Sequence, residues 1–277
     1  MNNVLEGLKA AADILLPRVC IVCGRKLHLK ERHICLSCQA DMPRTWFWEQ
    51  SHNAMADRFN AAIQHGLEAA WAEAGGPEPA MAEPQGAASG SPHEPYAYAA
   101  ALFFYNNEAG YRHIPYQIKY HGNMSAGRHF GQIFGRYLAS SALFSDVDII
   151  IPVPLHWTRK WKRGYNQAEV IASAVAEAMA RPLRTDILIR SRRTRTQTKL
   201  DIKGKARNVS GAFKVSRRHI LTEVPVHILT EMPVHILIID DVFTTGSTLM
   251  ACFTALRTVF PPSVRISIAT LAFVGGA

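Results

Sequence analysis

The sequence has no run of about 18 apolar residues, which is the length that a helix needs to cross a bilayer. Its first residues, MNNVLEGLKAAADILLP, also lack the basic start and continuous apolar stretch of a secretory signal. We therefore expect a cytoplasmic protein without a membrane span. Apolar residues at helical spacing between Val4 and Leu15 predict an amphipathic helix that packs on its own protein.

Acidic residues are scarce: 22 Asp and Glu stand against 31 Lys and Arg, giving a formal charge of +9. Between Arg159 and Arg218 the acids are Glu169, Glu177, Asp186 and Asp201. A stretch this basic binds phosphates of a nucleotide, pyrophosphate or single-stranded nucleic acid, or it is a solvated surface. Charge alone leaves both possibilities open.

Bulky apolar residues are nearly missing from residues 73–95, EAGGPEPAMAEPQGAASGSPHEP. This composition cannot offset the entropy of ordering, so it predicts a flexible linker or an extended loop. The linker divides the chain into an N-terminal module, residues 1–72, and a larger domain, residues 96–277. Four of the five cysteines lie in the N-terminal module.

In residues 96–277, apolar runs alternate with helical patterns, which is typical of a parallel sheet with crossover helices. The predicted strands are 99–105, 147–153, 183–189, 211–215, 236–239 and 264–272. The predicted helices are 114–119, 127–140, 167–180 and 247–260. An octapeptide at 221–228, LTEVPVHI, is repeated with one substitution at 229–236 and predicts a loop or an edge strand without a function of its own.

The strand at 236–239 reads as fully buried and is followed by two carboxylates, Asp240 and Asp241. Paired carboxylates can accept hydrogen bonds from adjacent ribose hydroxyls, while N–H and O–H groups at a helix start bind phosphate. The alternative is a buried strand and turn with a simple helix cap. Packing does not require two acids at the end of a buried strand, so we favour a ribose-phosphate site. Its phosphate loop comprises Thr244, Thr245, Gly246, Ser247 and Thr248.

A second candidate site follows the strand at 147–153, because ligands collect beyond the ends of parallel strands. The basic residues there are Arg159, Lys160, Lys162 and Arg163, followed by Gly164. They would suit pyrophosphate in a loop that allows close backbone approach, although a solvated basic loop is the alternative. The polar segment 190–213, which includes Gln197 and Asn208, predicts a mobile loop that orders over an anionic ligand.

Two C-x-x-C pairs, Cys20 with Cys23 and Cys35 with Cys38, are separated by eleven residues. Each pair lets two thiolates reach one tetrahedral ion, and four-sulfur zinc sites are structural. Disulfides or free thiols are the alternative, which a reducing cytoplasm disfavours. The fifth cysteine, Cys252, is predicted to be a small buried residue.

Taken together, these segments resemble the ComF family, whose members are associated with bacterial competence and DNA uptake. The matching motifs are IKYHGN at 118–123, PVPL at 152–155, RGYNQ at 163–167, T-x-x-Q at 194–197, R-N-V-x-G-A-F at 207–213 and IIDDVFTTGST at 238–248. The cysteine module is similar to the zinc ribbon that precedes such domains. The duplicated octapeptide and the long linker depart from the family pattern.

The resemblance implies a type I phosphoribosyltransferase fold, with a parallel sheet flanked by helices, that binds phosphoribosyl pyrophosphate with Mg²⁺. Asp240 and Asp241 would hold the ribose hydroxyls and residues 244–248 the 5′-phosphate. The candidate catalytic residues are Asp240, Asp241 and Arg163. The candidate pyrophosphate residues are Arg159, Lys162, Arg163, Gln197 and Asn208.

Three functions stay open at this point. The first is a competence protein that binds phosphoribosyl pyrophosphate, single-stranded DNA and the DNA-uptake machinery. The second is an active phosphoribosyltransferase for a nucleobase or another small acceptor, and the third is a non-catalytic module regulated by a nucleotide. For DNA, Trp157 and Trp161 could stack on bases beside the basic residues, or they could pack the loop onto the domain.

Overall fold

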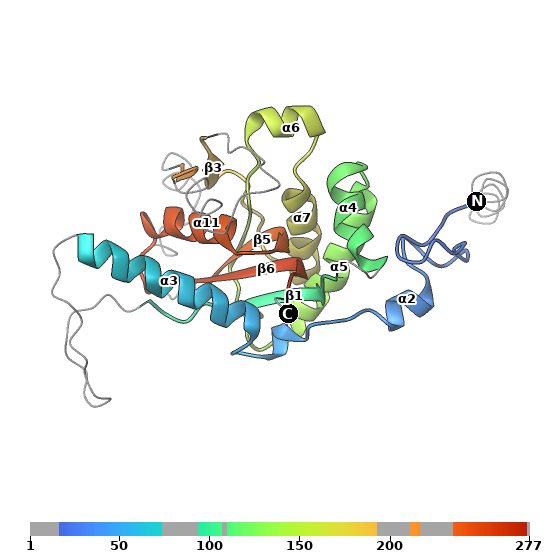
Figure 1. Ribbon diagram of the computed structural model, residues 1–277, viewed down its shortest axis with the longest axis horizontal. Helices are drawn as coiled ribbons and strands as arrows, with labels where there is room; N and C mark the ends of the chain where they lie inside the picture. The colour runs from blue at the N-terminus through green and yellow to red at the C-terminus, as the bar shows by residue number, and fades with distance from the viewer. Residues whose placement is uncertain (1–16, 74–93, 107–109, 193–210, 217–234, 276–277) are drawn as a thin grey trace.

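The computed structural model in Figure 1 describes residues 17–73, 94–106, 110–192, 211–216 and 235–275. The expected first helix lies outside the described residues, as do Gln197, Asn208 and most of the duplicated octapeptide. Among the described residues, no helix combines the length and the apolar character that a membrane span requires.

A four-stranded parallel sheet in the order β1-β6-β5-β2 forms the centre of the domain. Its strands are β1 (Ala99–Phe104), β2 (Ile149–Pro152), β5 (His235–Phe243) and β6 (Arg265–Phe273). The apolar residues 236–239 of β5 are buried on both faces, which explains their unbroken run in the sequence.

Helices cover both faces of this sheet (Figure 1). The chain passes through α4 (His113–Tyr120) and α5 (Met124–Ser140) between β1 and β2, through α7 (Gln167–Met179) after β2, and through α11 (Ser247–Arg257) between β5 and β6. The step from β5 to β6 runs along the sheet in the direction opposite to the step from β1 to β2. Because such crossovers are right-handed, α5 and α11 lie on opposite faces. The predicted α/β fold with a parallel sheet flanked by helices is thus confirmed.

Glycines bring α5 unusually close to α7. Gly127, Gly131 and Gly135 recur every four residues on one side of α5, and a Cβ atom at Gly131 would lie 2.8 Å from the carbonyl oxygen of Ile171. On the other face, α11 packs against α3 (Ala54–Glu73), where the rings of Phe59 and Phe253 meet edge to face at 5.7 Å.

Two of the six expected strands do not join the parallel sheet. Strands β3 (Leu188–Arg190) and β4 (Phe213–Val215) form a separate antiparallel pair. Only Leu183 reaches the main sheet, through one parallel bridge to Ile150. The chain bends at residues 185–187, directly after this bridge, and so the expected strand at 183–189 is divided.

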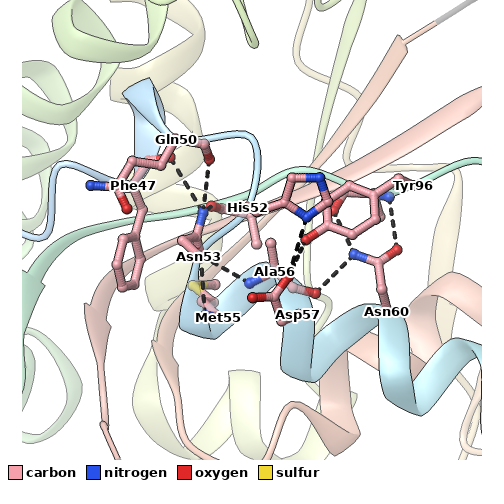
Figure 2. Close-up of polar contacts among 11 residues, drawn as sticks. Phe47, Gln50, His52, Asn53, Met55, Ala56, Asp57, Asn60 and Tyr96 are labelled. Atoms are coloured by element: carbon pink, nitrogen blue, oxygen red, sulfur yellow. Dashed lines mark hydrogen bonds and ion pairs between the residues drawn. The ribbon is translucent and has the colours of Figure 1, made fainter.

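A segment before α3 covers the outer edge of β1 (Figure 2). The side-chain amide of Asn60 makes two hydrogen bonds of 2.9 Å with the backbone N–H and C=O of Ala97, as a neighbouring strand would. The side chain of Asn53 donates to the carbonyl oxygen of Ala99 at 3.0 Å and caps α3 by accepting from the backbone of Ala56. Further along β1, Arg44 forms an antiparallel bridge with Phe103, and the N–H of Phe104 donates to the carbonyl oxygen of Pro43 at 2.8 Å. Side chains and backbone together therefore cover this edge of the sheet, which is not left open to another chain.

Candidate functional site

The two carboxylates at the end of β5 lie on opposite sides of the strand, since consecutive strand residues alternate. Asp241 is buried, with 5% of its surface exposed, and its Oδ2 lies 3.7 Å from Nζ of Lys119 on α4. Removal from water and the neighbouring Asp241 raise the pKa of Asp240 to about 8. The pKa of Lys119 is raised, chiefly by the charge of Asp241.

The carboxylate of Asp241 has unused capacity to accept hydrogen bonds. Its Oδ1 accepts from the backbone N–H of Val242 at 3.0 Å, whereas its buried Oδ2 accepts no hydrogen bond from any described residue. Nζ of Lys119 compensates the charge of Oδ2 from 3.7 Å, which is beyond hydrogen-bond distance. A ligand hydroxyl beside Lys119 could therefore donate to Oδ2.

The loop after β5 turns into α11 at Gly246, whose φ of +76° favours glycine. A Cβ atom there would lie 2.8 Å from the ring of Phe243. Gly246 gives α11 no side-chain cap, and Thr245 Oγ1 lies 2.9 Å from Ser247 Oγ. Donors at this helix start, together with the hydroxyl groups, suit a phosphate.

Arg58 of α3 contacts the loop that joins β5 to α11. Its Nη1 donates to the carbonyl oxygens of Thr244 at 3.3 Å and Val274 at 3.5 Å, and its guanidinium lies 5.4 Å from the ring centroid of Phe273. Nothing in the local sequence around Arg58 indicated this role, because the partners lie about 200 residues away and meet only through the packing of α3.

The basic segment after β2 forms a helix, α6 (Trp157–Arg163), where the sequence predicted a loop. His156 caps its start by accepting from the backbone of Thr158, and Gly164 ends it with φ of +83°. Lys160 pairs with Glu169 at 3.1 Å, while Arg163 contacts the side chain of Gln167. The sequence prediction of a loop was based on the charge of this segment and did not use its two cap residues.

The structure brings one of these basic residues toward the carboxylates. The guanidinium of Arg163 lies 5.9 Å from the ring centroid of Tyr120, which also lies 5.9 Å from Nζ of Lys119. Trp157 and Trp161 of α6 are 71% and 87% exposed. They do not pack the segment onto the domain, which was the alternative to a stacking role.

A cavity of about 230 Å³ lies between α4 and the end of β5. Its lining residues come from the end of β1, from α4 and the turn before it, and from the loop after β5: Tyr105, Arg112, Pro115, Tyr116, Lys119, Tyr120, Val242, Thr244 and Val274. The sequence prediction did not find this cavity. The only signal was the IKYHGN motif, which contains Lys119 and Tyr120 but gave no role for either.

The four cysteines of the N-terminal module converge as predicted. The sulfur atoms of Cys20, Cys23, Cys35 and Cys38 all lie within 4.8 Å of one another, and those of Cys23 and Cys35 are 3.7 Å apart. Sulfurs bound at about 2.3 Å to one tetrahedral zinc ion would be separated by about 3.8 Å. The cluster is therefore compatible with a structural zinc ion. Cys252 is fully buried in α11, as expected.

The cysteine module contacts the segments on either side of α4. Tyr111, in the 3-10 turn Gly110–Arg112 before α4, donates its hydroxyl to the carbonyl oxygen of Cys38 at 2.8 Å. A Cβ atom at Gly110 would lie 2.2 Å from the carbonyl oxygen of Val22. Beyond α4, Nε2 of His33 lies 3.0 Å from Oγ of Ser125. The module thus contacts the turn before α4 and the start of α5, the two segments that flank the helix lining the cavity.

The fold and the site together define an α/β protein with two carboxylates at a strand end, a glycine turn into the next helix, and a four-cysteine module. Curated relatives confirm the resemblance of this chain to the ComF family. It is 32% identical over 119 residues to Competence protein F of Haemophilus influenzae, which covers 43% of this chain and 48% of that protein. It is 32% identical over 102 residues to the DNA utilization protein YhgH of Escherichia coli K12, covering 37% and 40%.

The matched regions thus span less than half the length of these relatives. No family model matches the chain. Among solved structures, one titled as the allosteric regulatory enzyme of purine biosynthesis aligns with 51% of this chain and 25% of its own, at 20% identity and a TM-score of 0.31. That likeness is too remote to support a conclusion.

Proposed function

We propose that this chain is a ComF-type cytoplasmic protein that binds phosphoribosyl pyrophosphate with Mg²⁺ at the end of β5 and the start of α11. The observation that carries the proposal is the carboxylate pair Asp240 and Asp241 near the end of β5, five residues before the glycine turn into α11. At that turn the N-cap residue Gly246 offers no side chain, and the N–H of Ser247 has a long hydrogen bond of 3.5 Å to Oγ1 of Thr245. The ribose hydroxyls and the 5′-phosphate of one ligand, joined through the same sugar ring, match these two neighbouring features.

Each part of the ligand has a group suited to it. The open acceptor on Asp241 suits a ribose hydroxyl, and Asp240, whose pKa is raised, suits a second hydroxyl or a nearby cation. Residues 244–248 would hold the 5′-phosphate. Mg²⁺ would arrive with the pyrophosphate and lower its charge. Arg159, Lys162 and Arg163 on α6 would attract the pyrophosphate, together with Gln197 and Asn208 from the segment outside the described residues.

The experiment is calorimetric titration of phosphoribosyl pyrophosphate with Mg²⁺ into the wild type and into the double variant Asp240→Asn with Asp241→Asn. We expect binding to be abolished in the double variant while its melting temperature stays within a few degrees of the wild type. Asp41→Asn, at an exposed aspartate, is the control that should bind normally. Wild-type affinity in the double variant would refute the assignment.

A link to DNA is supported by the names of the relatives and by α6. Two exposed tryptophans, Trp157 and Trp161, alternate there with Lys160 and Lys162. Aromatic rings that stack on bases and cations that follow phosphates are the two parts of a single-strand binding surface. We propose that single-stranded DNA binds on α6, which would connect the chain with the DNA-uptake machinery.

Affinity for an oligonucleotide measured against salt concentration tests this second part. The logarithm of the affinity should fall with a slope of about −0.7 for each phosphate that the protein neutralises. Replacing Trp157 and Trp161 by Leu should weaken binding roughly tenfold or more without altering the slope, because stacking carries no counterion release. A flat salt response would exclude backbone contacts.

The cavity beside Asp241 favours catalysis as a second candidate over a purely regulatory nucleotide site. Release of pyrophosphate from phosphoribosyl pyrophosphate, screened over nucleobases, nucleotides and single-stranded DNA, separates the two. An active phosphoribosyltransferase releases pyrophosphate with one acceptor class. A regulatory module binds the same ligand and releases none.

A further inference from the structure

We propose that the cysteine module holds α4 in place beside Asp241, so that zinc at the four cysteines and phosphoribosyl pyrophosphate at the end of β5 strengthen each other's binding. This inference rests on the proposed function, because it concerns the ligand proposed there. It adds a regulatory role to a module whose four-sulfur site is otherwise structural. The contacts that carry it run from the two cysteine pairs to the turn before α4, and from Lys119 of α4 to Asp241.

Both cysteine pairs touch the turn that leads into α4. The hydroxyl of Tyr111 donates to the carbonyl oxygen of Cys38, the last of the four cysteines, at 2.8 Å. The neighbouring Gly110 lies against the carbonyl oxygen of Val22, within the first C-x-x-C pair, where a Cβ atom at residue 110 would lie 2.2 Å from that oxygen. These two contacts need the cysteine pairs to keep their shape, and a small four-sulfur module keeps its fold through the bound ion.

The module also touches the chain beyond α4. Nε2 of His33 lies 3.0 Å from Oγ of Ser125, the second residue of α5. Between α4 and α5, the backbone N–H groups of His121 and Asn123 donate to the carbonyl oxygen of Gln117 on α4, at 3.1 Å and 3.3 Å. The helix α4 has eight residues, so its two ends are about 12 Å apart. The module thus fixes both flanks of a short helix.

The last turn of α4 connects these contacts with the ligand site. Nζ of Lys119 lies 3.7 Å from Oδ2 of Asp241. The carbonyl oxygen of the preceding residue, Ile118, accepts a hydrogen bond from the hydroxyl of Tyr165. Tyr165 belongs to the RGYNQ motif, which begins at the end of α6. A movement of α4 therefore changes the surroundings of the carboxylate and of the segment proposed to attract pyrophosphate.

The direction of the effect follows from the burial of Asp241. With 5% of its surface exposed, this carboxylate needs the charge of Lys119 nearby. If α4 loosens and Lys119 withdraws, the carboxylate takes up a proton or turns toward water, and in either state it no longer offers the same acceptor to a ribose hydroxyl. Ile114 and Ile118 are fully buried, so core packing keeps α4 partly in place without the module. We therefore expect weakened binding of the ligand and not its loss.

Calorimetric titration of the full chain measures the coupling. Phosphoribosyl pyrophosphate with excess Mg²⁺ is titrated into the zinc-loaded protein and into protein from which zinc has been removed by a chelator and dialysis. Affinity should be about tenfold lower without zinc, within the roughly 5–150-fold range of typical coupling between two sites. Because such coupling is reciprocal, the ligand with Mg²⁺ should raise the affinity for zinc by the same factor, measured against a zinc-selective dye. Equal affinity with and without zinc overturns the inference.

A double variant that keeps all four cysteines tests the path. Tyr111→Phe with Ser125→Ala removes the two hydrogen bonds described above between the module and the flanks of α4. Loaded with zinc, it should bind phosphoribosyl pyrophosphate about threefold to tenfold more weakly than the wild type. Tyr96→Phe with Ser140→Ala is the matched control, because these two hydroxyls donate to Asp57 on α3 and to the backbone at the end of α5. If the control loses as much affinity as the double variant, or if the double variant binds as the wild type does, the inference fails.

The same titrations separate this inference from the proposed function. If the zinc-loaded wild type does not bind phosphoribosyl pyrophosphate, the proposed function fails, and the inference with it. If it binds with equal affinity whether or not zinc is present, the proposed function stands and the inference fails. If removal of zinc unfolds the whole domain, as circular dichroism would show, the zinc-loaded double variant decides, because its titration needs no zinc-free protein.

Discussion

Asn60 offers a direct test of how the outer edge of the sheet is held. Its side-chain amide takes the place of a neighbouring strand for Ala97, donating to the carbonyl oxygen and accepting from the N–H at 2.9 Å each. The residue Ala97 is buried, with 1% of its surface exposed. Asn60→Leu keeps a side chain of similar size on α3 but removes both hydrogen bonds (Figure 2).

The cost follows from the two backbone groups that lose their partners. Leaving a buried donor or acceptor unpaired costs about 1–3 kcal/mol, and the two groups are adjacent and partly relieved by water at the edge. We therefore expect Asn60→Leu to lower the free energy of unfolding by about 2–4 kcal/mol. For a domain of roughly 200 residues this corresponds to a fall in melting temperature of roughly 5–15 °C.

Urea denaturation of the zinc-loaded chain measures the change, with far-ultraviolet circular dichroism as the signal. Gln64→Leu, one turn further along α3, is the matched control, because Gln64 is exposed and its side chain donates to Glu68 at the surface. That control should change stability by less than about 0.5 kcal/mol. If Asn60→Leu costs no more than Gln64→Leu, the side chain is not what satisfies the edge of β1.

Further tests concern the cover of β1, the cysteine module, Asp240 and His129. A fragment beginning at residue 96 should aggregate, whereas one beginning at residue 42 should fold, because residues 43–60 cover β1. Soluble yield and circular dichroism of the two fragments measure the difference. A chelator should release one zinc ion per chain and abolish hydrogen-exchange protection in residues 17–41 before it affects β5. The pKa of Asp240 is raised to about 8, so this residue should ionise between about pH 6 and about pH 9. Affinity for phosphoribosyl pyrophosphate should rise over the same range. Asp240→Asn should bind weakly at every pH. Burial lowers the pKa of His129 from 6.5 to about 4. The free energy of unfolding should therefore fall as the pH drops from about 6.5 to about 4, because the unfolded chain takes up the proton first. Urea denaturation should show a smaller fall for His129→Gln than for the wild type.

The sequence by itself determined the features whose signals are local. The apolar run at 236–239, the two acids after it and Gly246 lie close together, so their order alone predicted a buried strand, a turn and a helix start. The predicted end of the strand was wrong, because β5 continues through both acids to Phe243, where it still pairs with β6. The spacing of the cysteines likewise predicted their convergence, because each C-x-x-C pair forms its own turn. The helix α6 was readable too, from His156 and Gly164, but its charge suggested a loop.

Only the tertiary structure decided which distant residues meet. Lys119 faces Asp241, Arg58 donates to the carbonyl oxygen of Thr244 across 186 positions, and Asn60 pairs with Ala97. The cavity lined by α4 and the separation of β3 and β4 from the parallel sheet belong to the same group. Such contacts depend on how helices pack on the sheet, and a side chain that reaches across a packed interface leaves no period or spacing in its own segment of the sequence.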